Sequence, residues 1–121
     1  MYPPIFAVCA AASAVTALLG TAPTRVYPFG EAPQSGAYPY AVWQTVGGAP
    51  ENYLGNRPDM DSYTLQVDVY ADTGASARAV AAALRDAIEP HAYITRWSGE
   101  SKDAETARYR SSFDVSWLTS R

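Results

Sequence analysis

The residues that could carry out chemistry in this 121-residue chain are few and far apart. His91 is the one histidine; it follows Pro90 and has no partner at the spacing of a catalytic motif, so we interpret it as a surface residue. Asp68 and Asp114 lie within predicted strands, where two carboxylates could act as general acid and base. We favour the alternative that both side chains lie on the polar faces of their strands. The sequence therefore predicts a protein that is not an enzyme and has no catalytic residues.

Metal and cofactor sites are not indicated either. Cys9 is the one cysteine, and no His, Lys or Arg lies near it in the sequence to lower its pKa. This favours a small buried core residue over a reactive thiol. A single cysteine allows no intramolecular disulfide and no cysteine-based metal cluster. Glycine-rich phosphate loops, H-E-x-x-H and G-x-S-x-G are also missing. We expect neither a metal ion nor a cofactor.

Charge and hydropathy limit the classes of partner that the chain could bind. The net charge is −3, and the nine Lys and Arg are scattered from Arg25 to Arg121, so no basic patch for nucleic acid forms along the sequence. The first twenty residues are apolar, but no Lys or Arg precedes them and they include Pro3 and Pro4. They are also too rich in Ala and Ser for a spanning helix. We expect a buried helix in a reducing compartment, with neither a signal peptide nor a membrane contact.

Two helices are predicted. Apolar residues recur at three- and four-residue spacing over residues 4–19, and Gly20 suits the end of that helix. A second, alanine-rich helix follows Gly74 and stops at Pro90, with Asp72 and Thr73 as candidate N-caps. Both helices carry one apolar stripe, which suits packing against a sheet.

Alternating apolar and polar residues predict about five strands, near residues 24–29, 40–46, 62–71, 91–98 and 107–118. The order of elements predicts an α+β fold, in which a mostly antiparallel sheet has two helices packed on one face. We see no internal repeat and expect a single domain over residues 1–121.

The chain has three tryptophans and nine tyrosines, and many of them fall on predicted strands. They could meet another protein, or they could fill space left by the many alanines; the sequence leaves both readings open. Trp117 is in phase with Phe113 and Val115 and is predicted to be core. Trp43 is out of phase with Tyr40 and Val42 and is the better interface candidate.

The segment between Gly47 and Asp61 has no helical or strand period, and it contains Gly, Pro and Asn. We therefore predict a long loop, and loops of this length are often functional. We expect it to contact a neighbouring protein or subunit. The candidate interface residues are Trp43, Glu51, Tyr53, Leu54, Asn56 and Arg57.

Several segments together resemble the small tail-completion proteins of long-tailed phages. These segments are the apolar first helix, V-Y-P at 26–28, A-Y-P-Y-A-V at 37–42, the strand and helix at 63–88, and R-Y-R-S-S-F-D-V-S-W-L at 108–118. The resemblance covers nearly the whole chain, but it consists of residue types and includes no catalytic signature. Its most distinctive part is Y-A-D-T, at the end of a strand and before an alanine-rich helix.

The resemblance implies a tail terminator in the virion, at the head-proximal end of the tail. Such a protein forms a ring, commonly a hexamer, that stops growth of the tail tube and meets the head-completion connector. Genomic DNA would pass through the lumen without sequence-specific binding, so we expect carboxylates to dominate there. The loop candidates are Glu31, Asp59, Asp61, Glu100 and Asp103. The competing hypothesis is a small soluble α+β domain that binds a ligand against its aromatic strands.

Overall fold

The protein is described from a computed structural model, which places residues 2–34, 36–52 and 57–121. Within these ranges the chain forms three helices and one five-stranded sheet. In chain order the elements are α1 (Ile5–Ala10), α2 (Ser13–Leu19), β1 (Val26–Pro28), β2 (Tyr40–Pro50), β3 (Met60–Ala71), α3 (Gly74–Ile88), β4 (Tyr93–Lys102) and β5 (Tyr109–Ser120).

The strands are arranged in the order β1-β2-β3-β5-β4. β1 is parallel to β2, and every other neighbouring pair is antiparallel. β3 lies at the centre and pairs with β5 along its whole length, from Met60 opposite Ser120 to Ala71 opposite Tyr109. The predicted α+β class, with a mostly antiparallel sheet of five strands, is confirmed.

One face of the sheet forms the core with the helices. Leu65, Val67 and Val69 of β3 are buried on this face, beside Phe113 and Val115 of β5. Because side chains alternate between the two faces of a strand, the residues between them lie on the opposite face. The alternation predicted for both strands is confirmed.

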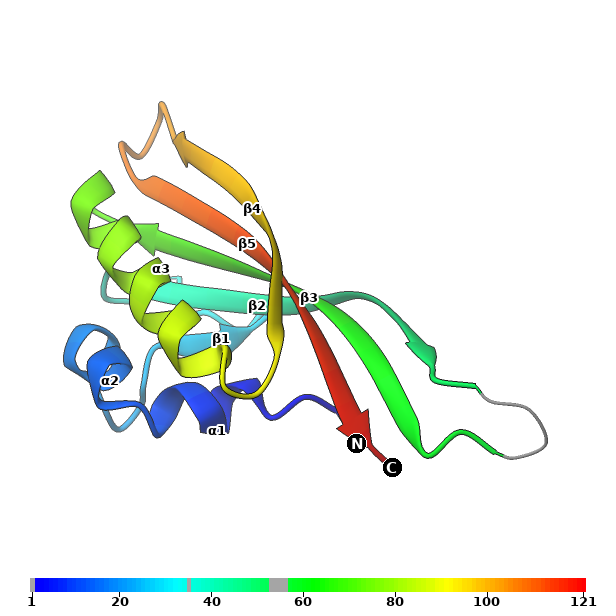
Figure 1. Cartoon of the computed structure of the whole chain (residues 1–121). Helices are drawn as coiled ribbons and strands as arrows, with labels where there is room; N and C mark the ends of the chain where they lie inside the picture. The colour runs from blue at the N-terminus through cyan, green and yellow to red at the C-terminus, as the bar shows by residue number, and fades with distance from the viewer. Residues whose placement is uncertain (1, 35, 53–56) are drawn as a thin grey trace.

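All three helices cover the same face of the sheet, as Figure 1 shows. α3 buries Val80, Leu84 and Ile88. Its first turn is capped by Thr73, whose Oγ1 accepts a hydrogen bond from the backbone N–H of Ser76 at 3.0 Å. This is one of the two N-caps predicted from the sequence, and it satisfies a backbone donor that the helix leaves free. The opposite face, called the open face below, has no helix over it in the described residues.

The first predicted helix, residues 4–19, is in fact two short helices. Ala12 has an extended backbone (φ −90°, ψ 119°) and separates α1 from α2. The break lets Ile5 and Cys9 of α1 and Val15 and Leu19 of α2 all reach the core. None of the helices in the described ranges is long and apolar enough to cross a membrane.

The predicted loop at 47–60 is wrong at both ends. β2 continues to Pro50 and β3 begins at Met60, so the two strands form a hairpin that projects beyond the helices (Figure 1). We call residues 46–50 and 60–64 of this hairpin the arm; its residues 47–50 pair with residues 61–64. A bulge between Thr45 and Gly47 marks its root. Gly48 permits the pairing, because a Cβ there would lie 2.8 Å from the backbone oxygen of Ser62.

Candidate functional site

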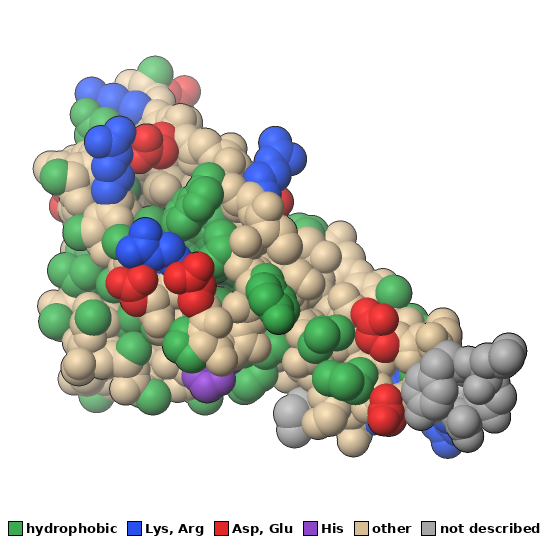
Figure 2. Space-filling model, viewed as in Figure 1, with side chains coloured by type: hydrophobic (Ala, Val, Ile, Leu, Met, Phe, Trp, Pro, Cys, Tyr) green, Lys and Arg blue, Asp and Glu red, His purple; other side chains and the backbone are tan. Residues whose placement is uncertain are grey.

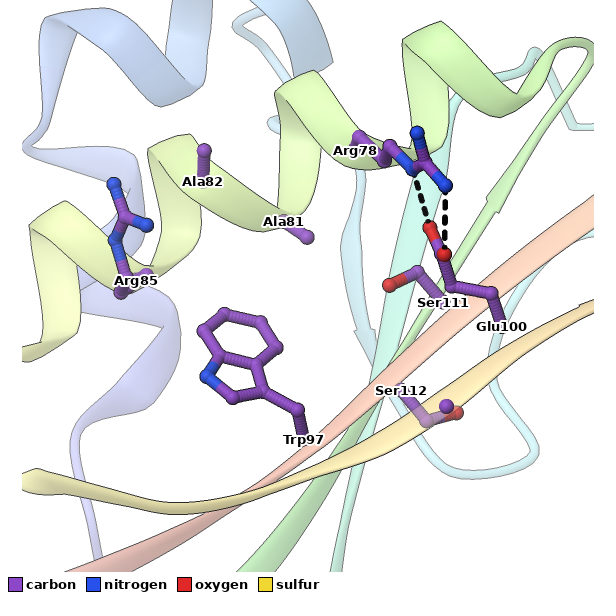
Figure 3. A pocket seen from close by; sticks show the side chains of 9 residues that line it. Arg78, Ala81, Ala82, Arg85, Trp97, Glu100, Ser111 and Ser112 are labelled. Carbon is purple, nitrogen blue, oxygen red and sulfur yellow. Dashed lines mark hydrogen bonds and ion pairs between the residues drawn. The ribbon is translucent and has the colours of Figure 1, made fainter.

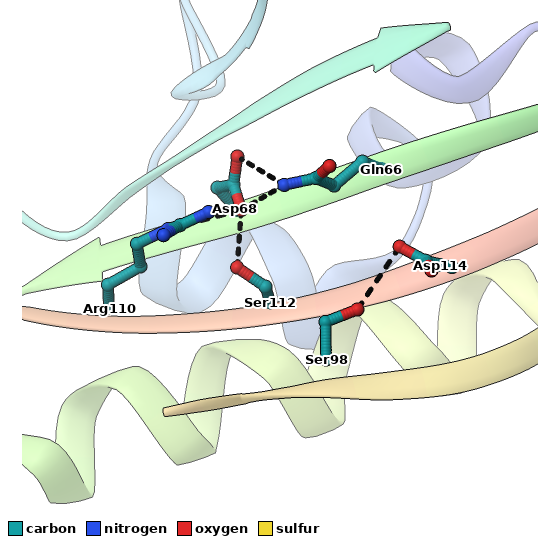
Figure 4. A network of polar contacts seen from close by, with 6 residues as sticks. All are labelled: Gln66, Asp68, Ser98, Arg110, Ser112 and Asp114. Carbon is teal, nitrogen blue, oxygen red and sulfur yellow. Dashed lines mark hydrogen bonds and ion pairs between the residues drawn. The ribbon is translucent and has the colours of Figure 1, made fainter. Parts of the chain in front are cut away.

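A carboxylate buried on the open face organises most of the polar contacts there (Figure 4). Asp68 lies in the middle of β3 and is 7% exposed. It accepts hydrogen bonds from Arg110 at 2.9 Å, from Gln66 at 3.2 Å and from the hydroxyl of Ser112. The bond to Asp68 raises the pKa of Arg110. A buried charge with this many donors is satisfied in place, so the cluster stabilises the sheet.

The second carboxylate of the predicted acid and base pair lies one diagonal step from the first, on the neighbouring strand. Asp114 pairs in register with Gln66, whereas Asp68 pairs with Ser112. Asp114 accepts a hydrogen bond from the hydroxyl of Ser98 at 3.2 Å (Figure 4). Both carboxylates lie on the open face, as predicted, but each has its own partners and their contacts do not form a shared site.

The other residues considered for chemistry are also apart. His91 lies exposed in the turn before β4. Cys9 is fully buried between the helices and the sheet, and burial raises the pKa of its thiol to about 12. Among residues 2–34, 36–52 and 57–121, no group of three or more His, Cys, Asp or Glu side chains could hold a metal ion. Within the described residues, no hydrogen bond or ion pair joins any two of the side chains of Asp68, Asp114, His91 and Cys9.

The open face carries a tyrosine cluster that sequence reasoning missed. The ring of Tyr40 stacks on Tyr70 with centroids 5.2 Å apart, and it also lies 5.2 Å from Tyr38 and 6.1 Å from Tyr27. Burial and the neighbouring tyrosines raise the pKa of Tyr40 to about 12. Tyr27 and Tyr38 lie outside the long strands, so the alternation within strands could not predict that the four tyrosines are neighbours. Clustered tyrosines are typical of surfaces that contact other proteins.

A hollow lies on the opposite face, between α3 and β4 (Figure 3). It has a volume of about 340 Å³ and is lined by Ala81 and Ala82 of α3 and by Trp97 of β4. Trp97 is 53% exposed, and its ring lies 5.3 Å from that of Phe113. At one end Arg78 forms a two-bond ion pair with Glu100, at 2.8 and 3.0 Å. The sequence placed Trp97 on a strand but could not show that half of it stays uncovered.

The predicted interface residues are dispersed over the arm and its surroundings. Glu51 and Arg57 are exposed at its far end, where Figure 2 shows a narrow projection from the body. Tyr53, Leu54 and Asn56 lie outside the described residues. Trp43 is not on the arm but on the helix-covered face of β2, opposite Val67 of β3.

Trp43 packs against the core and also has a buried polar atom without a hydrogen-bond partner in the described residues. It is half-buried against the core cluster, and its indole Nε1 is buried with no hydrogen-bond partner in the described residues. A buried indole N–H usually has a partner. Trp117, by contrast, is 3% exposed and belongs to the core, as predicted.

The carboxylates expected to face a lumen are only partly free. Asp61 is paired with Arg121 at 3.0 Å, and Glu100 is paired with Arg78. Asp103 accepts the backbone N–H of Glu105 in the β4–β5 turn at 2.8 Å. Glu31 and Asp59 are exposed. The ion pairs compensate two of the five negative charges in the set, and the place of these carboxylates in an assembly stays a prediction.

Comparisons with known proteins identify the fold and the family of the chain. A chain of the solved structure described as "Virion of native gene transfer agent (GTA) particle" has the same fold, with a TM-score of 0.75 over 97% of this chain and 92% of that one. The two sequences are 16% identical. A search of curated proteins finds no match.

The sequence profile of the family described as "Tail completion protein gp17" matches residues 3–120. The match covers every helix and strand of the fold. The chain therefore belongs to the tail completion protein gp17 family, and it is a structural protein of the virion tail.

Proposed function

We propose that this protein is a tail terminator, which forms a ring on the head-proximal end of the tail tube. The ring, a hexamer by resemblance, ends polymerisation of the tube and then joins the tail to the head-completion connector. The observation that carries this proposal is the arm in a chain of the tail-completion family. From Thr45 to Pro50 every residue of β2 is exposed, and within the described residues no helix covers this part of the strand. A paired hairpin outside the core is suited to contact with another protein.

The partners are other copies of the chain, the tail tube protein and a connector protein. Genomic DNA passes through the lumen without sequence-specific binding. The net charge of −3 supports this, since a ring of such subunits does not grip phosphates. One hydrophobic cluster includes residues of all three helices and of every strand except β4, which supports a single domain over residues 1–121. We propose a role in assembly and none in catalysis.

The test is to replace residues 50–57 with a Gly/Ser linker of equal length. The subunit should keep its fold, because these residues lie outside the core cluster. Tail completion should fail, and electron microscopy should show tails of irregular length without heads. The matched control replaces the β4–β5 turn, residues 103–107, in the same way. Normal infectious particles from the arm variant would contradict the proposal.

Trp43 allows a finer test of its predicted place in an interface. Trp43→Phe keeps most of the packing against the core and removes the indole N–H that lacks a partner. If a neighbouring subunit accepts that N–H, Trp43→Phe should weaken assembly and leave the stability of the isolated subunit nearly unchanged. Equal assembly by the variant and the parent protein would remove Trp43 from the interface.

The alternative, a ligand-binding domain, would use the hollow beside Trp97. The two functions differ in oligomeric state. A terminator should self-associate at high concentration, and electron microscopy should show annular particles. A protein that stays monomeric at every concentration and in every tail preparation would favour the ligand-binding domain.

A further inference from the structure

We propose that the two opposite edges of the sheet are the two halves of a head-to-tail contact between copies of this chain. The β1–β2 edge, with Phe29 and Val46, packs against the β4–β5 edge of the next copy, with Tyr93, Trp97 and Leu118. This inference rests on the ring of the proposed function and names the surfaces that build it.

The exposed large hydrophobic side chains are concentrated at these edges. Phe29 is 61% exposed and Val46 52%, while on the other side Tyr93 is 71% exposed and Trp97 53%. The central strand β3 has no side chain of this kind within the described residues. The remaining ones are Tyr2, Phe6 and Leu18, which belong to the N-terminal segment and its helices. Apolar side chains gathered on opposite edges mark contact surfaces.

The β1–β2 edge offers an unpaired backbone without charge. β1 pairs only with residues 41–43 of β2. The N–H of Ala41 and the carbonyl of Trp43 bond to residues 25 and 29 on that outer side, so alternation directs the peptide groups of Thr45 outward as well. From Thr45 to Pro50 the sequence is T-V-G-G-A-P, with no charged side chain. Soluble proteins rarely leave such an edge open, because it pairs readily with another chain.

The β4–β5 edge has a different character. β4 is irregular between Ile94 and Arg96 and again between Trp97 and Gly99, where Gly99 has φ +109°. Bulges, and charged residues such as Arg96 on this edge, hinder an edge from pairing with an identical edge. Its apolar surface continues past the start of β4 to Leu118, which is 45% exposed. Figure 2 shows hydrophobic side chains gathered between α3 and β4 and on toward the arm.

The occupant that matches both edges is a second copy. Because the edges differ, a head-to-tail arrangement places the first edge of each subunit against the second edge of the next. Such contacts close into a ring when the rotation between subunits permits it. The charges agree: Glu51 ends the first edge and Arg96 lies on the second, and neither has an ion pair within the described residues.

Cysteine cross-linking tests this pairing directly. Val46→Cys and Tyr93→Cys each place one thiol on an exposed side chain, while the native Cys9 is buried and unreactive. With a short bismaleimide, neither variant alone should form dimers. A mixture of the two should give dimers, and the double variant should give a ladder that ends at the number of copies in the ring. The reaction is run on concentrated protein and on assembled tails. Ala79→Cys, on the exposed side of α3, replaces Tyr93→Cys in the matched control.

Each outcome decides one question. Dimers from Val46→Cys alone would show a two-fold contact and overturn the inference. A link from Val46→Cys to another tail protein would also overturn it. Annular particles without a link between positions 46 and 93 would overturn the edge pairing and leave the ring standing. A monomer in solution and in tails would remove the ring itself, and the inference with it.

Discussion

The helix-covered body and the arm are built from the same strands but are held together in different ways. In the body Leu65, Val69 and Phe113 are fully buried under α3 and its neighbours. Along the arm β2 is exposed and β3 is only partly covered, so backbone pairing with few packed side chains maintains it. The contrast teaches that packing selects the residues of the body, whereas contact with other proteins can select those of the arm.

The largest effect should come from the body where it meets the arm. Trp117→Ala should lower the free energy of unfolding by about 3–5 kcal/mol, because truncating a buried aromatic residue removes its contacts and leaves a cavity. Trp117 is 3% exposed. Leu118→Ala, the neighbouring change on the open face, should cost about 0.5 kcal/mol or less. Denaturant unfolding measures both values, and equal costs would erase the distinction between the two faces.

A smaller loss is expected from the open face of the body. Asp68→Ala should cost about 1–3 kcal/mol, because it leaves the buried partner Ser112 and the guanidinium of Arg110 without their acceptor. Asp114→Ala, with one hydrogen bond to Ser98, is the matched control and should cost less. A double-mutant cycle with Arg110→Ala should give a coupling of about 0.5–3 kcal/mol. Additive costs would mean that the cluster does not act as a unit.

Gly47 and Gly48 are adjacent in the arm, but only Gly48 has a backbone atom close to the position that a Cβ would take. Gly48→Ala should destabilise the protein by about 1 kcal/mol, because the new Cβ would press on the backbone of Ser62, and overpacking has costs of this order. Gly47→Ala should be neutral, since no atom lies within 4 Å of a Cβ there. Amide exchange should become faster in β2 and β3 of the arm for the first variant alone. Faster exchange throughout the body would show that the arm and the body unfold together.

The smallest effect concerns pH at the end of the arm. The hydrogen bond from Arg121 lowers the pKa of Asp61 below its ordinary value. The pair therefore stabilises the fold above the unfolded-state pKa of this carboxyl, and the contribution is lost as the pH falls through the folded-state pKa. A titration of Asp61 followed by NMR should show the lowered pKa in the parent protein. It should return toward the ordinary value in Arg121→Ala, and an unchanged titration there would rule out the pair.

The body could be predicted well because its signals are local. The period of two in β3 and β5 follows from the burial of one face, and Thr73 is a cap that the sequence places correctly. The break at Ala12 could not be predicted, since alanine favours helix and the break follows from packing of two short helices on one sheet. The burial of Asp68 was also out of reach, because its partner Arg110 lies 42 residues away.

The arm was misjudged for a physical reason. Gly47, Gly48 and Pro50 are strand-breaking residues in a central strand, but an edge strand accepts a proline whose missing N–H faces outward. Gly48 is required by the close approach of β3. The candidate site could be predicted in part. The sequence places Trp43 and Trp97 on strands, but only the fold shows how much of each side chain is covered.

Both ends of the described chain lie beside the arm. The ring of Tyr2 is 5.5 Å from that of Tyr63, and the backbone N–H of Arg121 bonds to the carbonyl of Asp59 at 2.9 Å (Figure 1). A purification tag or fluorescent protein fused at either end would therefore stand next to the arm, the surface that we propose to act in assembly. The β4–β5 turn, with exposed residues 103–107 at the opposite end of the sheet, is the better place to insert an epitope for locating the protein in intact particles.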